Sequence, residues 1–192
     1  MKLAQTKVTK PGFRIALALA LSVMLFLPAA YADSTLTLTR PNAQNLGRFG
    51  FSVVINEGDP IVVVGAPRET ANALPRAGHA YVFDATDGSL IASLTSPYAQ
   101  AFGRFGISVS VNCTTVVVGA YHETADGQAA AGHAYSFDAT TGFLTTTLTS
   151  PNAQNGGEFG WSVAVSGTTV VVGAQSETGS GFAGAGHAYI FP

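Results

Sequence analysis

The stretch Gly78-His79-Ala80-Tyr81 occurs three times in this chain. Its other copies follow at intervals of 54 residues, as Gly132-His133-Ala134-Tyr135 and Gly186-His187-Ala188-Tyr189. A Phe-Gly pair precedes each copy, at positions 49–50, 105–106 and 159–160. Self-similarity at a fixed period is the signature of a repeat architecture, in which each repeat is one supersecondary unit. The repeats therefore divide the chain into units of about 33–88, 89–142 and 143–192.

Each unit predicts four β-strands, which in the first unit cover residues 51–55, 61–64, 79–83 and 90–94. The second of these strands is continuously apolar, as in a strand that is buried on both faces. Gly-containing turns join the third strand to the fourth, as hairpins require. Apolar inner strands followed by a Thr-rich outer strand are typical of a propeller blade. The predicted fold class is therefore all-β, with three four-stranded antiparallel blades.

The two ends of the repeat region predict how the outer blades are completed. Residues 35–41 match the fourth strand that ends at Pro151, whereas the chain finishes on a third strand, Tyr189-Ile190-Phe191. We therefore expect the N-terminal strand to complete the last blade. Closed propellers carry about four to eight blades, so three blades do not close alone. A homodimer with six blades is our hypothesis, and a fragment of a longer repeat protein and an open array are the alternatives.

The Phe-Gly pairs and the glycines that follow them resemble a known repeat. Phe49-Gly50 followed by Val64-Gly65-Ala66-Pro67 is similar to the FG-GAP repeat of integrin α-subunits and of many bacterial surface proteins. The resemblance implies an extracellular β-propeller that recognises a protein or a carbohydrate. Integrin-like blades often hold Ca²⁺ in the first hairpin, but these hairpins carry only Glu57 and Asp59 as acids, and Ca²⁺ takes six to eight oxygen ligands. We expect no metal there, as in a bacterial-type secreted form without calcium loops.

The first 32 residues predict a signal peptide. Four basic residues precede an apolar run over residues 15–27, and Ala30-Tyr31-Ala32 supplies a small-x-small cleavage pattern. The apolar run is too short to cross the hydrocarbon core of a bilayer, which is about 30 Å thick. We expect cleavage after Ala32, export to the extracellular space or the periplasm, no membrane insertion afterwards, and a repeat domain over residues 33–192.

The charge of residues 33–192 excludes several classes of function. This segment contains five Arg, no Lys and eleven acidic residues, so its formal charge is −6. Proteins that bind nucleic acid need a basic face, and anionic membrane surfaces attract basic segments, so neither partner is expected. Cys113 is the only cysteine, which excludes an internal disulfide. No catalytic constellation and no cofactor motif stands out, and we predict a protein that is not an enzyme.

Variable loops between the second and third strands are the predicted ligand-binding rim, because binding residues often lie on loops of a rigid scaffold. These loops cover residues 67–77, 121–131 and 175–185 and share a rim with inter-blade loops such as residues 97–104. The predicted partner is an extracellular protein or a carbohydrate, and a glycan-binding or glycan-cleaving propeller is the alternative. The candidate ligand-binding residues are Arg68, Glu69, Arg76, Tyr98, Phe102, Tyr121, His122, Glu123, Glu177 and Phe182.

Two side chains recur in every unit and have a structural interpretation beside the functional one. Glu69-Thr70 returns at 123–124 and 177–178, either as a ring of carboxylates or as a turn that satisfies backbone N–H groups. Recurrence favours the structural role. The histidine of each Gly-His-Ala-Tyr stretch is predicted to make a hydrogen bond within its blade rather than to bind a metal. Trp161 occupies the position of Phe51 and Ile107, which predicts a core residue.

Overall fold

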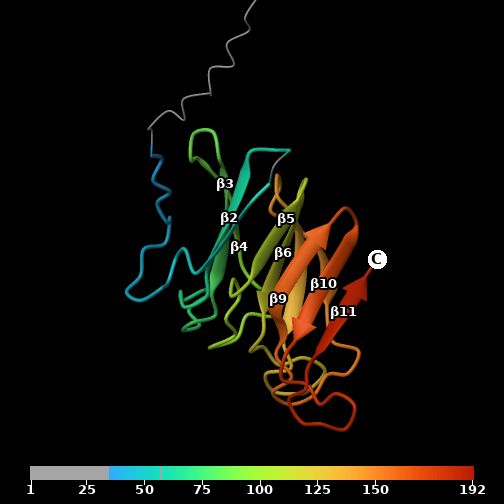
Figure 1. The fold of residues 1–192 in the computed structure, drawn as a ribbon. Coiled ribbons are helices and arrows are strands. Elements are labelled where there is room, and N and C mark those ends of the chain that lie inside the picture. The colour runs from blue at the N-terminus through green and yellow to red at the C-terminus, as the bar shows by residue number, and fades with distance from the viewer. Residues whose placement is uncertain (1–34, 57) are drawn as a thin grey trace, which may run out of the picture. The chain divides into compact units, whose positions relative to one another are not determined.

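The computed structural model describes residues 35–56 and 58–192, which form eleven strands in three antiparallel sheets (Figure 1). The predicted signal peptide lies outside these residues. Within the two described ranges, no helix is long and apolar enough to cross a membrane.

Each sheet is a propeller-like blade whose strand order follows the sequence. The first contains β1 (Ser52–Ile55), β2 (Ile61–Ala66), β3 (His79–Asp84) and β4 (Leu90–Leu94). The second contains β5 (Val109–Asn112), β6 (Thr115–Ala120), β7 (His133–Asp138) and β8 (Leu144–Leu148). The third contains β9 (Phe159–Ser166), β10 (Thr169–Ala174) and β11 (His187–Phe191). This arrangement confirms the predicted all-β, blade-type fold.

The pairing register repeats from blade to blade. Val64 lies opposite Tyr81, and Val118 lies opposite Tyr135. In the third blade Val172 lies opposite Tyr189. The valine runs of β2, β6 and β10 favour the extended backbone, because β-branched side chains pack well on a pleated surface. Repetition of the sequence therefore gives repetition of the register, and each tyrosine reaches the same place in its own blade.

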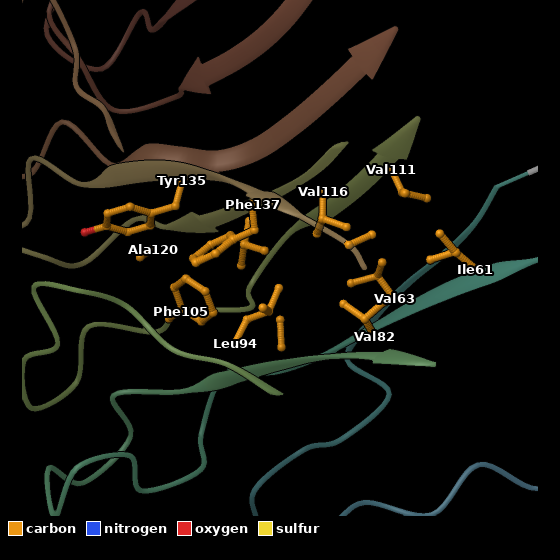
Figure 2. Packing of buried hydrophobic residues seen from close by; sticks show 13 residues of the cluster. Ile61, Val63, Val82, Leu94, Phe105, Val111, Val116, Ala120, Tyr135 and Phe137 are labelled. Carbon is orange, nitrogen blue, oxygen red and sulfur yellow. The ribbon is translucent and has the colours of Figure 1, made fainter. Parts of the chain in front are cut away.

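The core lies between the faces of neighbouring sheets. Figure 2 shows Val63, Val82 and Leu94 of the first sheet packed toward Phe105 and Phe137 of the next unit. Another cluster joins the second sheet to the third around the fully buried Phe159. Burial of each such side chain contributes about 1.5–3 kcal/mol, so face-to-face packing holds the blades together.

The N-terminal strand does not complete the last blade within one chain, contrary to our expectation. Residues 36–40 belong to no sheet, and Leu38 packs instead with Phe49, Tyr81 and Phe83 of the first blade. In the described part of the chain the third sheet has three strands, so eleven strands are found where twelve were predicted. The first and third sheets both pack on the second, which keeps residues 36–40 away from β11 (Figure 1).

Candidate ligand-binding site

One end of each blade is built from two loops that hydrogen-bond to each other. The loop after the second strand donates to the loop before the first, through Arg68 N to Gly47 O at 3.1 Å and His122 N to Gly103 O at 3.3 Å. The residue before each Phe-Gly pair has a positive φ, which is 60° at Arg48, 65° at Arg104 and 59° at Glu158. Such angles are uncommon outside glycine and persist where the surrounding structure fixes them.

A pocket of about 200 Å³ lies among these loops, and all three blades contribute to it. Arg48 lies over the ring of Phe51, 5.7 Å from its centroid. Tyr121 and Trp161 meet edge to face with their ring centroids 4.7 Å apart. The pocket thus combines aromatic walls with guanidinium groups. It is lined by Arg48, Phe51, Pro67, Arg68, Arg104, Ile107, Tyr121 and Trp161.

The pocket gathers most of the positive charge that follows the predicted signal peptide. Burial lowers the pKa of Arg104 from its ordinary value, and the charges of Arg68, Arg76 and Arg48 lower it further. Guanidinium groups nevertheless stay protonated in proteins. Among the residues that the structure describes, every ion pair within 4 Å joins a histidine to a glutamate. No carboxylate of the described ranges therefore neutralises these arginines within that distance.

The third blade carries an acid at the position of the two arginines. Glu158 accepts hydrogen bonds from Gln175 Nε2 at 2.8 Å and from Ser176 Oγ at 2.7 Å. These bonds hold its carboxylate within the third blade. The positive charge of the pocket therefore comes from the first two blades alone.

The family of the chain follows from the same repeats that build this site. The profile of the FG-GAP repeat family matches residues 89–137 and 144–191. This chain belongs to the FG-GAP repeat family. No curated protein matches it. Each matched segment runs from the fourth strand of one blade to the third strand of the next, so an FG-GAP repeat and a blade are offset by one strand.

The loops of the FG-GAP repeats place several candidate residues on a common surface. Phe102 N donates to Pro75 O at 2.8 Å, which joins an inter-blade loop to a loop after the second strand. Arg76 lies over Phe102, 5.6 Å from its ring centroid, and the exposed Tyr98 stacks on His133. The exposed His122 contacts Tyr121 edge to face. Phe182 is exposed on the loop of the third blade, so only Arg68 and Tyr121 of the candidates line the pocket.

The three candidate glutamates lie inside their blades and not on the rim surface. Glu69, Glu123 and Glu177 are 0 % exposed, because the turn after the second strand folds each one back beneath the loop. In each blade Oε2 accepts a hydrogen bond from a tyrosine hydroxyl, that of Tyr81, Tyr135 or Tyr189. Burial in these positions leaves no path to a ligand on the surface.

The repeated histidines contact the same carboxylates. The Nδ1 atoms of His79, His133 and His187 lie 3.1, 3.1 and 3.0 Å from Oε2 of the glutamate in their own blade. Within the described ranges, no group of three or more His, Cys, Asp or Glu side chains is arranged to hold a metal ion. The recurring Glu, His and Tyr of each FG-GAP repeat thus form a polar group inside one blade, in which the glutamate is fully buried.

Sequence reasoning selected only two of the eight residues that line the pocket. Trp161 was predicted to be a core residue, but it is 40 % exposed and lines the pocket beside Phe51 and Ile107. Arg48 and Arg104 were not selected either. The available signal was variation next to an unvarying motif, since the residue before the repeated Phe-Gly pair is Arg, Arg and Glu in the three units.

Proposed function

We propose that this FG-GAP repeat protein is an exported binding module, and that its pocket takes an acidic segment of an extracellular partner protein. The observation that carries the proposal is the group of Arg48, Arg68 and Arg104 around aromatic walls, with no carboxylate of the described residues within 4 Å. FG-GAP repeats suggest a binding or adhesion-type module. The signal-peptide pattern supports export.

The chemistry of the pocket suits a carboxylate that is flanked by an apolar side chain. Guanidinium groups bind carboxylates through two parallel hydrogen bonds, and aromatic rings add apolar contact area. Residues 33–192 have a total formal charge of −6, so the surface away from the arginines is acidic. Their field repels an acidic segment everywhere except near the arginines, and this contrast favours one binding position.

The glycan-cleaving alternative loses its candidate carboxylates. A glycosidase needs two carboxyl groups about 5–10 Å apart on either side of the scissile bond. Glu69, Glu123 and Glu177 are buried in three different blades and do not reach a shared surface. Binding of an acidic glycan uses the same guanidinium chemistry, so a sulfated polysaccharide serves as the competing probe.

Trp161 provides the test, because it is the only tryptophan of the chain and it lines the pocket. We expect an oligo-glutamate peptide ending in phenylalanine to change its fluorescence saturably, with weaker binding at high salt. Arg104→Gln should weaken this binding about tenfold or more, since hydrogen bonds to charged groups contribute about 1.5–3 kcal/mol.

Arg40→Gln is the matched control, because it removes the same charge beside Tyr81, outside the pocket. Far-UV circular dichroism should show the same strand content in both variants as in the unchanged protein. Equal loss of binding in the two variants would contradict a local site. Selective binding of the sulfated polysaccharide would overturn the protein-segment proposal in favour of a glycan.

A further inference from the structure

We propose that a second copy of this chain covers the open faces of both outer blades, and that residues 36–40 of each copy complete the third blade of the other by pairing with β11 in a closed six-bladed ring. This inference does not depend on the ligand of the pocket. It rests on three features of the outer blades: their bare faces, the placement of residues 36–40, and the backbone groups at their edges.

The outer faces expose side chains that the inner interfaces bury. Val82 and Ser136 are 0 % and 7 % exposed between blades, whereas Ile190, at the same position of the third blade, is 71 % exposed. On the opposite face, Val111 is 7 % exposed against the first blade, whereas its counterpart Ile55 is 64 % exposed. The exposed face of the first blade and the exposed face of the third blade thus match the two sides of an interface between neighbouring blades.

Residues 36–40 already occupy the place of a fourth strand. Leu38 corresponds to Leu94 and Leu148, each followed by a proline three residues later. Leu94 and Phe105 belong to one core cluster, Leu148 packs against the cluster of Phe159, and Leu38 and Phe49 both pack against the cluster of the first blade. However, β4 and β8 also pair with the third strand of their own blade, and residues 36–40 have no such strand among those described. Among the described strands, β11 has a partner on one edge only (Figure 1).

Hydrogen bonds from backbone N–H and serine hydroxyl groups recur between neighbouring blades, and the series predicts the pairs that form between the two copies. Phe105 N donates to Ala77 O at 2.8 Å, and Phe159 N donates to Ala131 O at 2.8 Å. The corresponding pair is Phe49 N of one copy with Ala185 O of the other. Likewise, Ser52 Oγ donates to Gly106 O and Ser108 Oγ donates to Gly160 O, both at 2.9 Å. The next member of this series joins Ser162 of one copy to Gly50 of the other.

A second copy fits because one chain supplies both halves of the interface. Two copies related by a twofold axis make two identical interfaces, and this symmetry is the commonest one in soluble oligomers. Six blades lie within the range of about four to eight in which propellers close. Closure also removes the exposed strand edges, which otherwise promote aggregation.

A cysteine cross-link tests the register of the exchanged strand. The pairs Val82 with Ala92 and Ser136 with Thr146 predict that Ile190 lies opposite Leu36 of the second copy. In a Cys113→Ser background, oxidation of the doubly substituted chain Leu36→Cys, Ile190→Cys should give a covalent dimer. Either cysteine alone should give none, because a disulfide needs Cα atoms within about 7 Å.

Light scattering during size exclusion tests the assembly itself. The unchanged chain should have twice the mass of one chain, and Ile190→Asp should have the mass of one chain with an unchanged far-UV circular dichroism spectrum. Phe143→Asp is the matched control and should remain a dimer, because Phe143 is 74 % exposed in the turn between β7 and β8. A monomeric unchanged chain, or a mass that grows without limit as concentration rises, would overturn the closed ring.

Discussion

A buried carboxylate needs hydrogen-bond donors, and each blade supplies them from its own third strand. Glu123 receives the hydroxyl of Tyr135, and Ser96 Oγ donates to that hydroxyl at 3.1 Å. In the third blade Ser150 Oγ donates directly to Glu177. Arg40 holds the corresponding position in the first blade, where its charge lowers the pKa of Tyr81 against the larger upward effect of burial. The polar group is therefore common to the blades, while the fourth-strand residue beside it varies.

These groups predict a loss of stability in alkaline solution. Burial raises the pKa of Tyr81, Tyr135 and Tyr189 above the ordinary value of 10.0, and the neighbouring glutamate raises it further. Below pH 10 these phenols are neutral in both states, so their contribution is fully present. Above pH 10 the unfolded chain ionises first, and the free energy of unfolding falls as pH rises.

Tyrosinate absorbance and circular dichroism, recorded along one pH titration, measure this effect. We expect the buried phenols of Tyr81 and Tyr135 to ionise only as the strand signal is lost. The chain in concentrated urea, titrated in parallel, gives the ordinary behaviour as a reference. Complete ionisation of every tyrosine with the strand signal intact would show that the buried phenols are accessible.

At the scale of the element, adjacent blades approach so closely that only glycine fits in the second strand. A Cβ at Gly119 would lie 1.9 Å from Gly160 O, and a Cβ at Gly65 would lie 2.1 Å from Gly106 O. A Cβ at Gly173 would approach only Ser162 of its own blade, 2.4 Å from Oγ. This glycine of the second strand thus approaches the next blade in the first two blades, whereas in the third blade it approaches only its own blade.

Substitution of these glycines separates folding from assembly. Gly119→Ala should lower the free energy of unfolding by about 1–3 kcal/mol, the usual cost of overpacking, because the carbonyl of the next blade cannot turn away. Gly173→Ala should cost less, since the Ser162 side chain can rotate. It should nevertheless give the mass of a single chain, because in the ring it meets the Gly50 carbonyl of the second copy. Urea unfolding and light scattering measure the two effects, and a dimeric Gly173→Ala protein would contradict the proposed interface.

Local pattern predicted most strands closely, because alternation, valine runs and glycine turns are properties of the segment itself. The expected strand over residues 61–64 is found within β2, and that over residues 79–83 within β3. The strand expected within residues 35–41 is not formed, since a strand also needs a partner strand and none of the described strands pairs with this segment. The pocket escaped prediction for a related reason. Its residues come from three repeats, and no single segment shows that Arg48, Arg104 and Trp161 converge.

For the whole molecule, the closed ring links stability to concentration. Association that involves only the folded state stabilises it by mass action, so the midpoint of thermal unfolding should rise with the concentration of the unchanged chain. The Ile190→Asp variant should unfold at a lower temperature that does not depend on concentration. Differential scanning calorimetry over a wide dilution series measures both behaviours, and a midpoint that is constant for the unchanged chain argues against a dimer in that range.

Positive charge is concentrated in one part of the whole molecule. Four of the five arginines after residue 33, namely Arg48, Arg68, Arg76 and Arg104, lie close enough for their charges to act on one another. The eleven acidic residues give residues 33–192 a formal charge of −6 despite these arginines. A molecule of this kind attracts an acidic partner over one small area and repels it over most of the surface. The electrostatic field therefore orients the partner before the two molecules touch.

The offset between repeat and blade has a consequence for how such proteins lengthen. Residues 89–137 bring the closing strand of one blade together with the first three strands of the next. A gene duplication that copies this segment therefore inserts a ready-made junction along with the new module, and no existing contact has to be redesigned. Growth by whole repeats therefore preserves the contact between a fourth strand and the blade that follows it.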